Sequence, residues 1–391
     1  MLAPLSPLKC KALACMNVTF VLWDGRIGGA ERLAVRLAAE FWSHGVGASV
    51  LFLGSDDQLA PELNAAGVPG AHLRFRSGSD ALRYPRRFVS AIHAQAADVV
   101  ILPDFGYLAV ALRIGGFTGA VIGVEHGNLA ELMCGANAKV NRTLKTKLLV
   151  SRISGVPAHD AEVVVSSFME SLSRRVRVHG KRLVQIPNGV PMCSPAPPPP
   201  MCTNVLKLAF AGRLIRGKGL DVLLRAVGVL RSQGCPVELE IAGDGPIRPQ
   251  LEQLARRTGV DGVVTFLGWT QDIGAFWNRN HVAVAPNDTV VESFCLSVAE
   301  AMSHSRPAIV TSLGALPELV VARVTGTVVT PGDADSIAAA ARGYLENPRE
   351  LELHGIGARE RAESIYALDR CATAYLQLAS ELAAQRGALR R

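Results

Sequence analysis

The stretch LKLAFAGRLIRGKGLDVLLRA, residues 206–226, shows the fold most clearly. An apolar run with strand character ends at a glycine-rich turn, and a helical pattern begins directly after it. The same order recurs along the chain from NVTFVLW at 17–23 to GTVVT at 326–330. This alternation is typical of a parallel sheet flanked by helices. We therefore predict an α/β fold with two Rossmann-like, doubly wound domains, whose ligands bind at the carboxyl ends of the strands.

A proline-rich stretch separates the two sets of strands and helices. It reads PAPPPPMCT at 195–203, and because it can continue neither a ladder nor a helix, we interpret it as an interdomain linker. We expect the two domains to face each other across a ligand-binding cleft. The expected parts are a disordered extension at 1–15, Rossmann-like domains at 16–194 and 204–365, and a last helix at 366–391.

The composition favours a soluble, intracellular protein. Hydrophobic residues make up 49% of the chain and charged residues 19%, which is more apolar material than one compact core needs. No apolar run is long enough to span a membrane, because charged residues, prolines or glycines interrupt each one. Eight cysteines are scattered without a C-x-x-C pair, so the sequence predicts neither a zinc site nor a disulfide framework. We therefore expect the protein to reside in a reducing cytoplasm.

The net charge of +7 lies entirely in the first half of the chain. Residues 1–200 hold 21 Lys and Arg against 14 Asp and Glu, whereas residues 201–391 hold 20 of each. This asymmetry indicates an anionic partner for the first domain, either a membrane face or a phosphate-bearing acceptor. We do not expect nucleic acid, because aromatic residues are only 5% and no basic stripe is interleaved with them.

Several motifs resemble those of glycosyltransferase family 4, the retaining enzymes with the GT-B fold. The resemblance runs from about residue 17 to 380, and its second-half motifs are the more specific. These motifs are AFAGRLIRGKGLDVLLRA (209–226), IAGDGP (241–246), TFLGWT (265–270), ESFCLSVAEAM (292–302) and LGALPELV (313–320). First-half motifs are GGAER (28–32), EHGN (125–128), VVVSSFMESL (163–172) and IPNGV (186–190).

The resemblance implies a metal-independent transferase without a cofactor. Its donor would be a UDP- or GDP-type nucleotide sugar, bound by the second domain, and the first domain would bind a glycan or a lipid-linked acceptor. The implied pathway is cell-surface polysaccharide or lipopolysaccharide synthesis at the cytoplasmic face of the inner membrane. The last helix, which carries Tyr366, Leu368, Cys371, Tyr375 and Leu378, would cross back to brace the first domain.

Glu292 and Glu300 form the strongest candidate site. Eight residues are a little over two helical turns, so both carboxylates can face one ligand from the same side of a helix. An unpaired glutamate among the apolar residues of SFCLSVAEAM would otherwise be costly. The resemblance assigns Glu292 to the donor sugar and Glu300 to the ribose. A helix that begins near Phe294 would offer its N–H groups to the diphosphate.

The resemblance implies further donor-binding residues, in this segment and in the motifs 209–226 and 241–246. Ser293 and Cys295 stand where the family usually has glycines, so the donor pocket is expected to be altered. The donor-binding set also includes Leu296, Gly212 and Gly243.

Arg213 and Lys218 form a second candidate site in the turn after LKLAFAG. Two fixed cations stabilise a departing nucleoside diphosphate without a metal, and the turn glycines hold them close to a strand end. The same turn nearly matches the phosphate loop of triphosphatases, G-x-x-x-x-G-K, but Gly219 replaces the hydroxyl residue that binds magnesium. A triphosphatase and a non-catalytic nucleotide-sugar-binding scaffold remain the alternatives.

Four further motifs are weaker. Gly28 and Gly29 open the first helix and would allow close approach to a phosphate, although a plain connecting turn is as good an interpretation. His126 follows a strand and is a candidate for contact with the donor or the reaction centre, against a purely structural role. The D-x-D spelling at Asp333 is interpreted as a helix cap without a metal. The basic, amphipathic stretch 138–153 is a candidate membrane contact or an ordinary surface helix.

Overall fold

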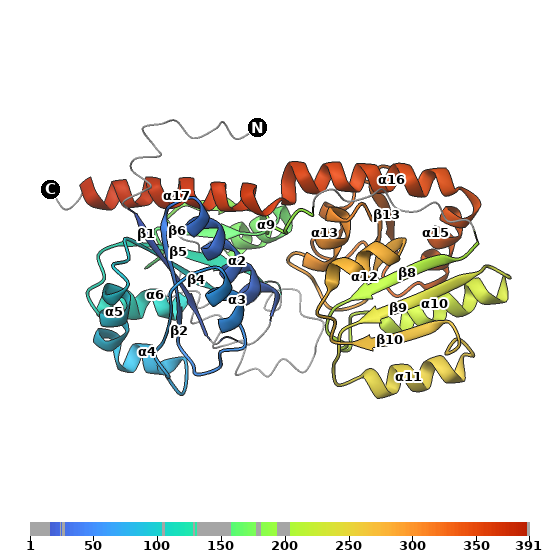
Figure 1. Cartoon of the computed structure of the whole chain (residues 1–391), viewed down its shortest axis with the longest axis horizontal. Helices are drawn as coiled ribbons and strands as arrows, with labels where there is room; N and C mark the ends of the chain where they lie inside the picture. Colours follow the sequence, from blue (N-terminus) through green and yellow to red (C-terminus); the bar gives the residue numbers. More distant parts are fainter. Residues whose placement is uncertain are drawn as a thin grey trace. The chain divides into compact units, whose positions relative to one another are not determined.

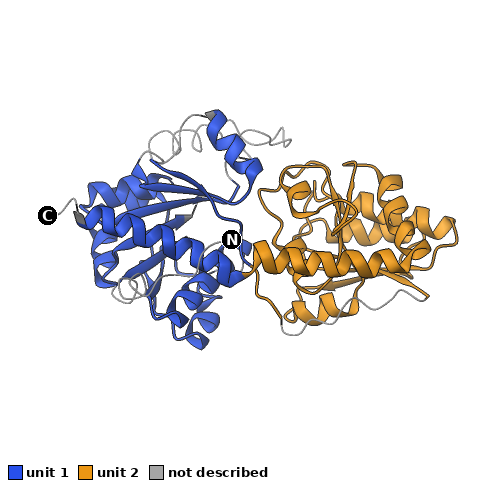
Figure 2. Ribbon diagram, turned by 90° about the horizontal axis from the view of Figure 1, so that it is seen from above, with its two compact units in different colours: residues 1–133, 139–189, 368–391 blue, residues 134–138, 190–367 orange. Residues whose placement is uncertain are grey.

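The chain folds into two compact units, which Figure 2 colours separately. The structure is a computed structural model, and it describes residues 16–23, 25, 28–103, 106–127, 130, 158–176, 181–193 and 204–388. Unit 1 is formed by residues before Val190 and by Leu368–Arg391, and unit 2 by Val190–Ala367, with residues 134–138 counted to it. The expected extension 1–15, linker 195–203 and basic stretch 138–153 lie outside the described residues.

Unit 1 is built on a parallel seven-stranded sheet with the strand order β3-β2-β1-β4-β5-β6-β7. The central strands are buried because their side chains are β-branched and apolar on both faces, as a sheet covered by helices requires. The strands are β1 (Asn17–Leu22), β2 (Gly47–Phe52), β3 (Gly70–His72), β4 (Val99–Pro103), β5 (Ala120–Glu125), β6 (Ala161–Val164) and β7 (Leu183–Gln185).

Helices cover both faces of this sheet (Figure 1). In α2, buried Leu33, Leu37, Ala38 and Phe41 recur at helical spacing and form the single predicted face. The helices of unit 1 are α2 (Gly29–Ser43), α3 (Ala60–Ala65), α4 (Ser79–Arg83), α5 (Pro85–Ala94), α6 (Gly106–Ile114), α9 (Ser167–Val176) and α17 (Leu368–Ala388).

The last helix, α17, packs on α2, β4 and β5. Its far end is fixed by Asp160, whose buried carboxylate accepts bonds from Arg386 Nε (3.3 Å) and from Arg113 (2.8 Å). Burial raises the pKa of the Asp160 carboxyl, but these cations and a bond from the Val121 N–H outweigh it and hold the pKa below its ordinary value. Tyr366 lies before this helix, in the π-helix η2 (Ala362–Tyr366) of unit 2.

Unit 2 is built on a parallel six-stranded sheet with the order β10-β9-β8-β11-β12-β13. Both sheets therefore have the doubly wound order, in which the third, second and first strands precede the fourth. The α/β fold prediction is confirmed. The strands are β8 (Leu206–Ala211), β9 (Val237–Ala242), β10 (Val264–Gly268), β11 (Val282–Ala285), β12 (Ala308–Thr311) and β13 (Gly326–Val329).

On one face of this sheet α10, α11 and α15 enclose a continuous apolar core, and on the other α13 packs with α16. Asp333 accepts bonds from the N–H groups of Asp335 and Ser336, so its predicted role as the cap of α15 is confirmed. The helices of unit 2 are α10 (Leu220–Ser232), α11 (Arg248–Arg257), α12 (Ile273–Arg279), α13 (Leu296–Ser303), α14 (Leu316–Leu319), α15 (Ala334–Glu346) and α16 (Pro348–Arg361). Within the described residues, no helix combines the length and the apolar character needed to cross a membrane.

Among the described glycines of unit 2, Gly219 leaves the least room for a Cβ atom. Its φ of +69° is in the left-handed region, and a Cβ built on it would lie 1.9 Å from the carbonyl oxygen of Pro286. Gly234 also has a positive φ, +75°, but a Cβ there would meet nothing within 4 Å. The two positions therefore separate backbone strain from steric overlap.

We expect Gly219→Ala to lower the free energy of unfolding by roughly 3 kcal/mol or more, because strain and overlap add. Gly234→Ala should cost only about 1–2 kcal/mol, the price of the left-handed backbone alone. Urea unfolding of both variants measures the difference. Equal losses would show that the overlap with Pro286 is absent.

Candidate functional site

The candidate site lies where the chain reverses its direction of travel across the sheet of unit 2. The connection after β8 leads to β9 on one side, and the connection after β11 leads to β12 on the other side. In doubly wound sheets this switch point opens a crevice at the carboxyl ends of the two central strands. The loop after β8 carries Arg213 and Lys218, and the loop after β11 carries Glu292.

Lys218 and Glu292 form an ion pair at this point, although 74 residues separate them. The Lys218 ammonium donates a hydrogen bond to Glu292 Oε1, and each side chain is only 16% exposed. Burial lowers the pKa of Lys218, but the Glu292 carboxylate outweighs burial, so this pKa lies above its ordinary value. Lys218 is therefore a fixed cation at neutral pH.

Asn287, which the sequence patterns did not indicate, is a second partner of Glu292. Its Nδ2 donates to Val290 O at 2.9 Å and lies 3.4 Å from Glu292 Oε1. The Asn287 side chain is buried, and the main-chain carbonyl of Asn287 accepts a hydrogen bond from Thr311 Oγ1 at 2.7 Å. The signal available in the sequence was its position directly after the strand run HVAVAP.

Main-chain hydrogen bonds hold the two loops together. The Gly217 carbonyl accepts backbone bonds from Asp288, Thr289 and Val290 at 2.9–3.3 Å, so the loop after β8 is fixed on the loop after β11. Farther along, Ala315 N donates to Glu292 O at 2.9 Å, which fixes the backbone that carries the carboxylate. The ion pair is thus positioned from two sides by main-chain bonds.

The helix α13 starts later than predicted. It begins at Leu296, and Cys295 is an extended N-cap residue without a side-chain capping bond. The prediction of a start near Phe294 was wrong by two residues, because Ser293 and Phe294 are buried in the extended segment that leads into the helix. Cys295 Sγ lies 3.3 Å from Ser297 Oγ, and burial raises the pKa of the Cys295 thiol.

The face of α13 that is not fully buried carries Leu296, Ser297 and Glu300, while Val298, Ala299, Ala301 and Met302 are buried. Glu300 thus lies one turn into a helix whose first N–H groups have no preceding carbonyl partners within the helix. Such an N-terminus favours anions through its N–H groups and dipole.

Gly212 and Gly243 pack against each other at the ends of β8 and β9. A Cβ on Gly243 would lie 2.0 Å from the Gly212 carbonyl oxygen, and Gly243 N donates to Gly268 O at 2.7 Å. These glycines therefore bring three strand ends together. Arg213, next to Gly212, is exposed and near enough to lower the pKa of Lys218 slightly against the effect of Glu292.

The predicted first-half residues Gly28, Gly29 and His126 belong to unit 1. Gly28 is the N-cap of α2 and Gly29 its first residue. A Cβ on Gly28 would lie 2.1 Å from Glu31 Oε2, so a carboxylate already lies beside the start of this helix. The candidate phosphate site at Gly28 therefore carries a negative charge of its own.

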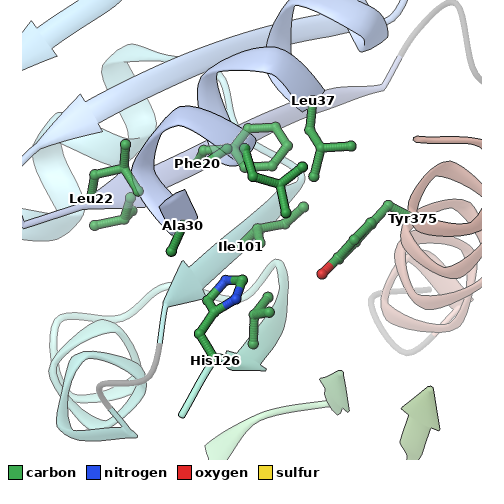
Figure 3. A pocket seen from close by; sticks show the side chains of 11 residues that line it. Phe20, Leu22, Ala30, Leu37, Ile101, His126 and Tyr375 are labelled. Carbon is green, nitrogen blue, oxygen red and sulfur yellow. The ribbon is translucent and has the colours of Figure 1, made fainter. Parts of the chain in front are cut away.

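His126 lines a small, largely apolar pocket between β1, α2, β5 and α17 (Figure 3). The pocket volume of about 20 Å³ is room for roughly one water molecule. Burial lowers the pKa of His126 to about 4, so the imidazole is neutral at pH 7. The lining residues are Phe20, Val21, Leu22, Ala30, Leu33, Ala34, Leu37, Ile101, Val124, His126 and Tyr375.

The two doubly wound units, with an ion pair at a switch point, define a two-domain α/β protein of the GT-B type. Residues 27–192 match the sequence profile described as Glycosyltransferase Family 4, and residues 206–347 match the profile described as Glycosyl transferases group 1. The chain belongs to the family 4 type of glycosyltransferases.

Solved structures agree with the fold over nearly the whole chain. A sucrose-phosphate synthase from Thermosynechococcus elongatus has a TM-score of 0.76 at 20% identity, covering 95% of this chain and 100% of that one. Anabaena HepE in complex with UDP and glucose has a TM-score of 0.76 at 19% identity, covering 94% and 100%.

Curated relatives match over shorter segments. Glycogen synthase from Mycobacterium tuberculosis is 32% identical over 187 residues, which are 47% of this chain and 44% of the relative. The lipopolysaccharide core biosynthesis mannosyltransferase LpcC from Rhizobium leguminosarum bv. viciae is 29% identical, over 42% of this chain and 47% of the relative. The chain thus spans less than half the length of these curated relatives.

The neutral His126 makes stability depend on pH. An unfolded histidine titrates near 6.5, and the folded value is about 4. Between these values the unfolded chain binds a proton that the folded chain does not, so the free energy of unfolding falls as the pH drops from about 6.5 towards 4. We expect His126→Gln to reduce this loss by about 2 kcal/mol.

The measurement is urea unfolding at pH 7 and at pH 4.5. His93→Gln, which changes an exposed histidine on α5, serves as the control and should leave the pH dependence unaltered. The same pH dependence in the His126→Gln variant and the wild type would contradict a neutral, buried imidazole.

Proposed function

We propose that this chain transfers a glycosyl group from a nucleoside diphosphate sugar to a hydroxyl group of a glycan or a lipid-linked acceptor. The observation that carries the proposal is the Lys218–Glu292 ion pair at the switch point of unit 2. The donor would bind at this crevice, with the diphosphate at the N-terminus of α13 and the ribose near Glu300.

The chemistry follows from the charges. As the bond between the sugar and the diphosphate breaks, negative charge develops on the leaving phosphate. Lys218 is held charged and in place by Glu292, Arg213 supplies a second, exposed cation, and α13 supplies N–H groups. On binding, the diphosphate takes over part of the bonding capacity of Lys218, which frees Glu292 to contact sugar hydroxyls. From the family resemblance we propose that transfer retains the configuration of the sugar at its reacting carbon. The departing phosphate then acts as the base that accepts the proton of the acceptor hydroxyl.

The relatives support the choice of substrates. One structural neighbour is a complex with UDP and glucose, and one relative is a mannosyltransferase of lipopolysaccharide core biosynthesis. We propose a UDP or GDP sugar as donor and a role in cell-surface polysaccharide or lipopolysaccharide synthesis, with cytoplasmic donor supply. The excess positive charge of residues 1–200 supports an anionic acceptor or a membrane face as the partner of unit 1.

The triphosphatase alternative loses support at Gly219. A phosphate loop needs a hydroxyl side chain at this position to bind magnesium, whereas the contact with Pro286 O leaves room only for glycine. Lys218, moreover, points to Glu292 of the neighbouring loop. Loss of activity on chelation that is restored by magnesium or manganese would favour this alternative or a metal site that the sequence patterns do not reveal.

Lys218→Ala should lower turnover about a hundredfold or more, the order expected for one lost electrostatic stabiliser. The matched control is Lys207→Ala, since Lys207 lies near the amino end of β8, the strand that precedes the Lys218 loop, and pairs with the exposed Glu238. Donor hydrolysis and transfer are measured by release of the nucleoside diphosphate, and thermal unfolding checks that both variants fold. Wild-type turnover in folded Lys218→Ala would contradict the proposal.

Glu292 and Glu300 should differ in their kinetic effects. Glu292→Gln removes a sugar contact and the carboxylate that fixes Lys218, so turnover should fall more than donor affinity. Glu300→Gln should mainly weaken nucleotide binding, because the ribose is far from the reacting bond. Inhibition by the nucleoside diphosphate and by the monophosphate separates the two effects. Equal losses of turnover and affinity in both variants would leave the assignment without support, and a fully active Glu292→Gln enzyme would overturn it.

A further inference from the structure

A cysteine with cationic neighbours lies in unit 2, beside the C-terminal end of α13. Cys193 Sγ donates a hydrogen bond to the Ser303 carbonyl at 3.2 Å, accepts one from Arg359 Nη1 at 3.4 Å and lies 3.6 Å from His304 Nδ1. The Cys193 carbonyl also accepts a bond from Arg359 Nη2 at 2.8 Å. Cys193 is half-buried, so part of the residue is open to solvent.

Arg306 adds a second guanidinium to this cluster. It is 1% exposed, and its Nε and Nη2 donate to Trp277 O and Asn278 O at 2.8 Å, while its buried Nη1 has no hydrogen-bond partner within the protein. Cys193 is close enough to Arg306 for a negative charge on the sulfur to stabilise the charged guanidinium. The cluster therefore contains a buried cation whose bonding capacity is incompletely used.

The acidic groups around the cluster are directed elsewhere. Glu363 is half-exposed and pairs with Nε of Arg359, on the side of the guanidinium away from the sulfur contact. His304 Nδ1 also contacts Asn278 Oδ1 at 2.9 Å. Burial, Arg306 and Arg359 lower the pKa of His304, while Asp272 opposes them, so the imidazole is neutral and both arginines carry the positive charge.

We infer that Cys193 is a modification site that reacts with small disulfides. The thiolate is the nucleophile in thiol–disulfide exchange, and the guanidinium of Arg359, which contacts the sulfur, attracts an anionic disulfide to this site. The Cys193 thiol gives its proton to solvent, and the sulfur attacks one sulfur of the disulfide. A new S–S bond joins Cys193 to one half of the reagent, the original S–S bond breaks, and the other half leaves as a thiolate. The reagent is the oxidant, and no other co-reactant is needed.

The modification acts on the contact between α16 and α13. Arg359 of α16 also donates to the carbonyl of Ser303, the last residue of α13, so it joins the two helices through the cluster. A group attached to Cys193 displaces the Arg359 guanidinium from the sulfur and crowds this carbonyl. The mixed disulfide therefore loosens the end of the helix that carries Glu300.

Cys235 is a matched control in the same unit. It is also half-buried, but it packs against the apolar core to which α10 contributes. The experiment uses the full chain with the four cysteines outside the described residues (Cys10, Cys15, Cys134 and Cys202) replaced by serine. The two reagents are the anionic dithiobis-nitrobenzoate and the neutral dithiodipyridine, and peptide mass spectrometry follows each cysteine separately.

We expect Cys193 to react with the anionic disulfide about tenfold faster than Cys235, and the neutral disulfide to show a smaller preference. Arg359→Gln should remove most of the preference for the anionic reagent, and Arg359→Lys, which keeps the charge, should restore part of it. If Arg359→Gln fails to fold, the Arg359→Lys variant and the comparison of the two reagents still decide the question. Equal rates at both cysteines with both reagents would overturn the inference.

A second readout tests the effect on the helices. Modified protein should melt about 2–4 °C lower and recover after reduction, whereas a Cys193→Ser variant treated in the same way should not change. Labelling of Cys193 without any shift in melting temperature would overturn the proposed link between the cluster and α13. Neither readout depends on glycosyl transfer, so the proposed function stands or falls separately.

Discussion

The close approach of Gly219 to the carbonyl of Pro286 is the constraint on which the site of unit 2 depends. It joins the loops that follow β8 and β11, two strands that are neighbours in the sheet but distant in the chain. Only glycine tolerates both the left-handed backbone and the short distance. With the loops in this register, the Gly217 carbonyl collects three N–H groups from the neighbouring loop, and Lys218 reaches Glu292.

The ion pair has two functions that follow from one geometry. A half-buried ammonium needs a partner in the unliganded protein, since an unpaired charge in this position would be costly. Glu292 provides the partner, and Asn287 Nδ2 contacts the same carboxylate oxygen, Oε1. In the proposed function, a phosphate that enters the crevice would meet a cation that is already charged and oriented, so little reorganisation would be required on binding.

Much of the fold could be predicted from local sequence patterns. Apolar runs such as LKLAFAG and the glycines that follow them predicted β8 and its turn, because both signals lie within a few residues. The right-handedness of the crossovers then restricts the topologies that this alternation can form. The start of α13 was predicted two residues too early, since burial of Phe294, which lies edge-on to Tyr366, competes with helix formation.

The contacts of the site could be predicted less well. Lys218 and Glu292 were both identified, but as separate groups, because no local signal reports a contact across 74 residues. Asn287 was missed for the same reason. The neutral state of His126 depends on a pocket that includes Tyr375 from α17, which the sequence pattern around His126 does not reveal.

The position of α17 has a consequence for synthesis on the ribosome. Unit 2 is an insertion within unit 1, since Leu368–Arg391 returns to the unit that the first residues began. The polypeptide that forms unit 2 is therefore fully translated while unit 1 still lacks the helix that covers α2 and β5. During translation the part of α2 that contacts α17 stays uncovered until Leu368–Ala388 emerges, so the unit that starts first is the unit that is completed last.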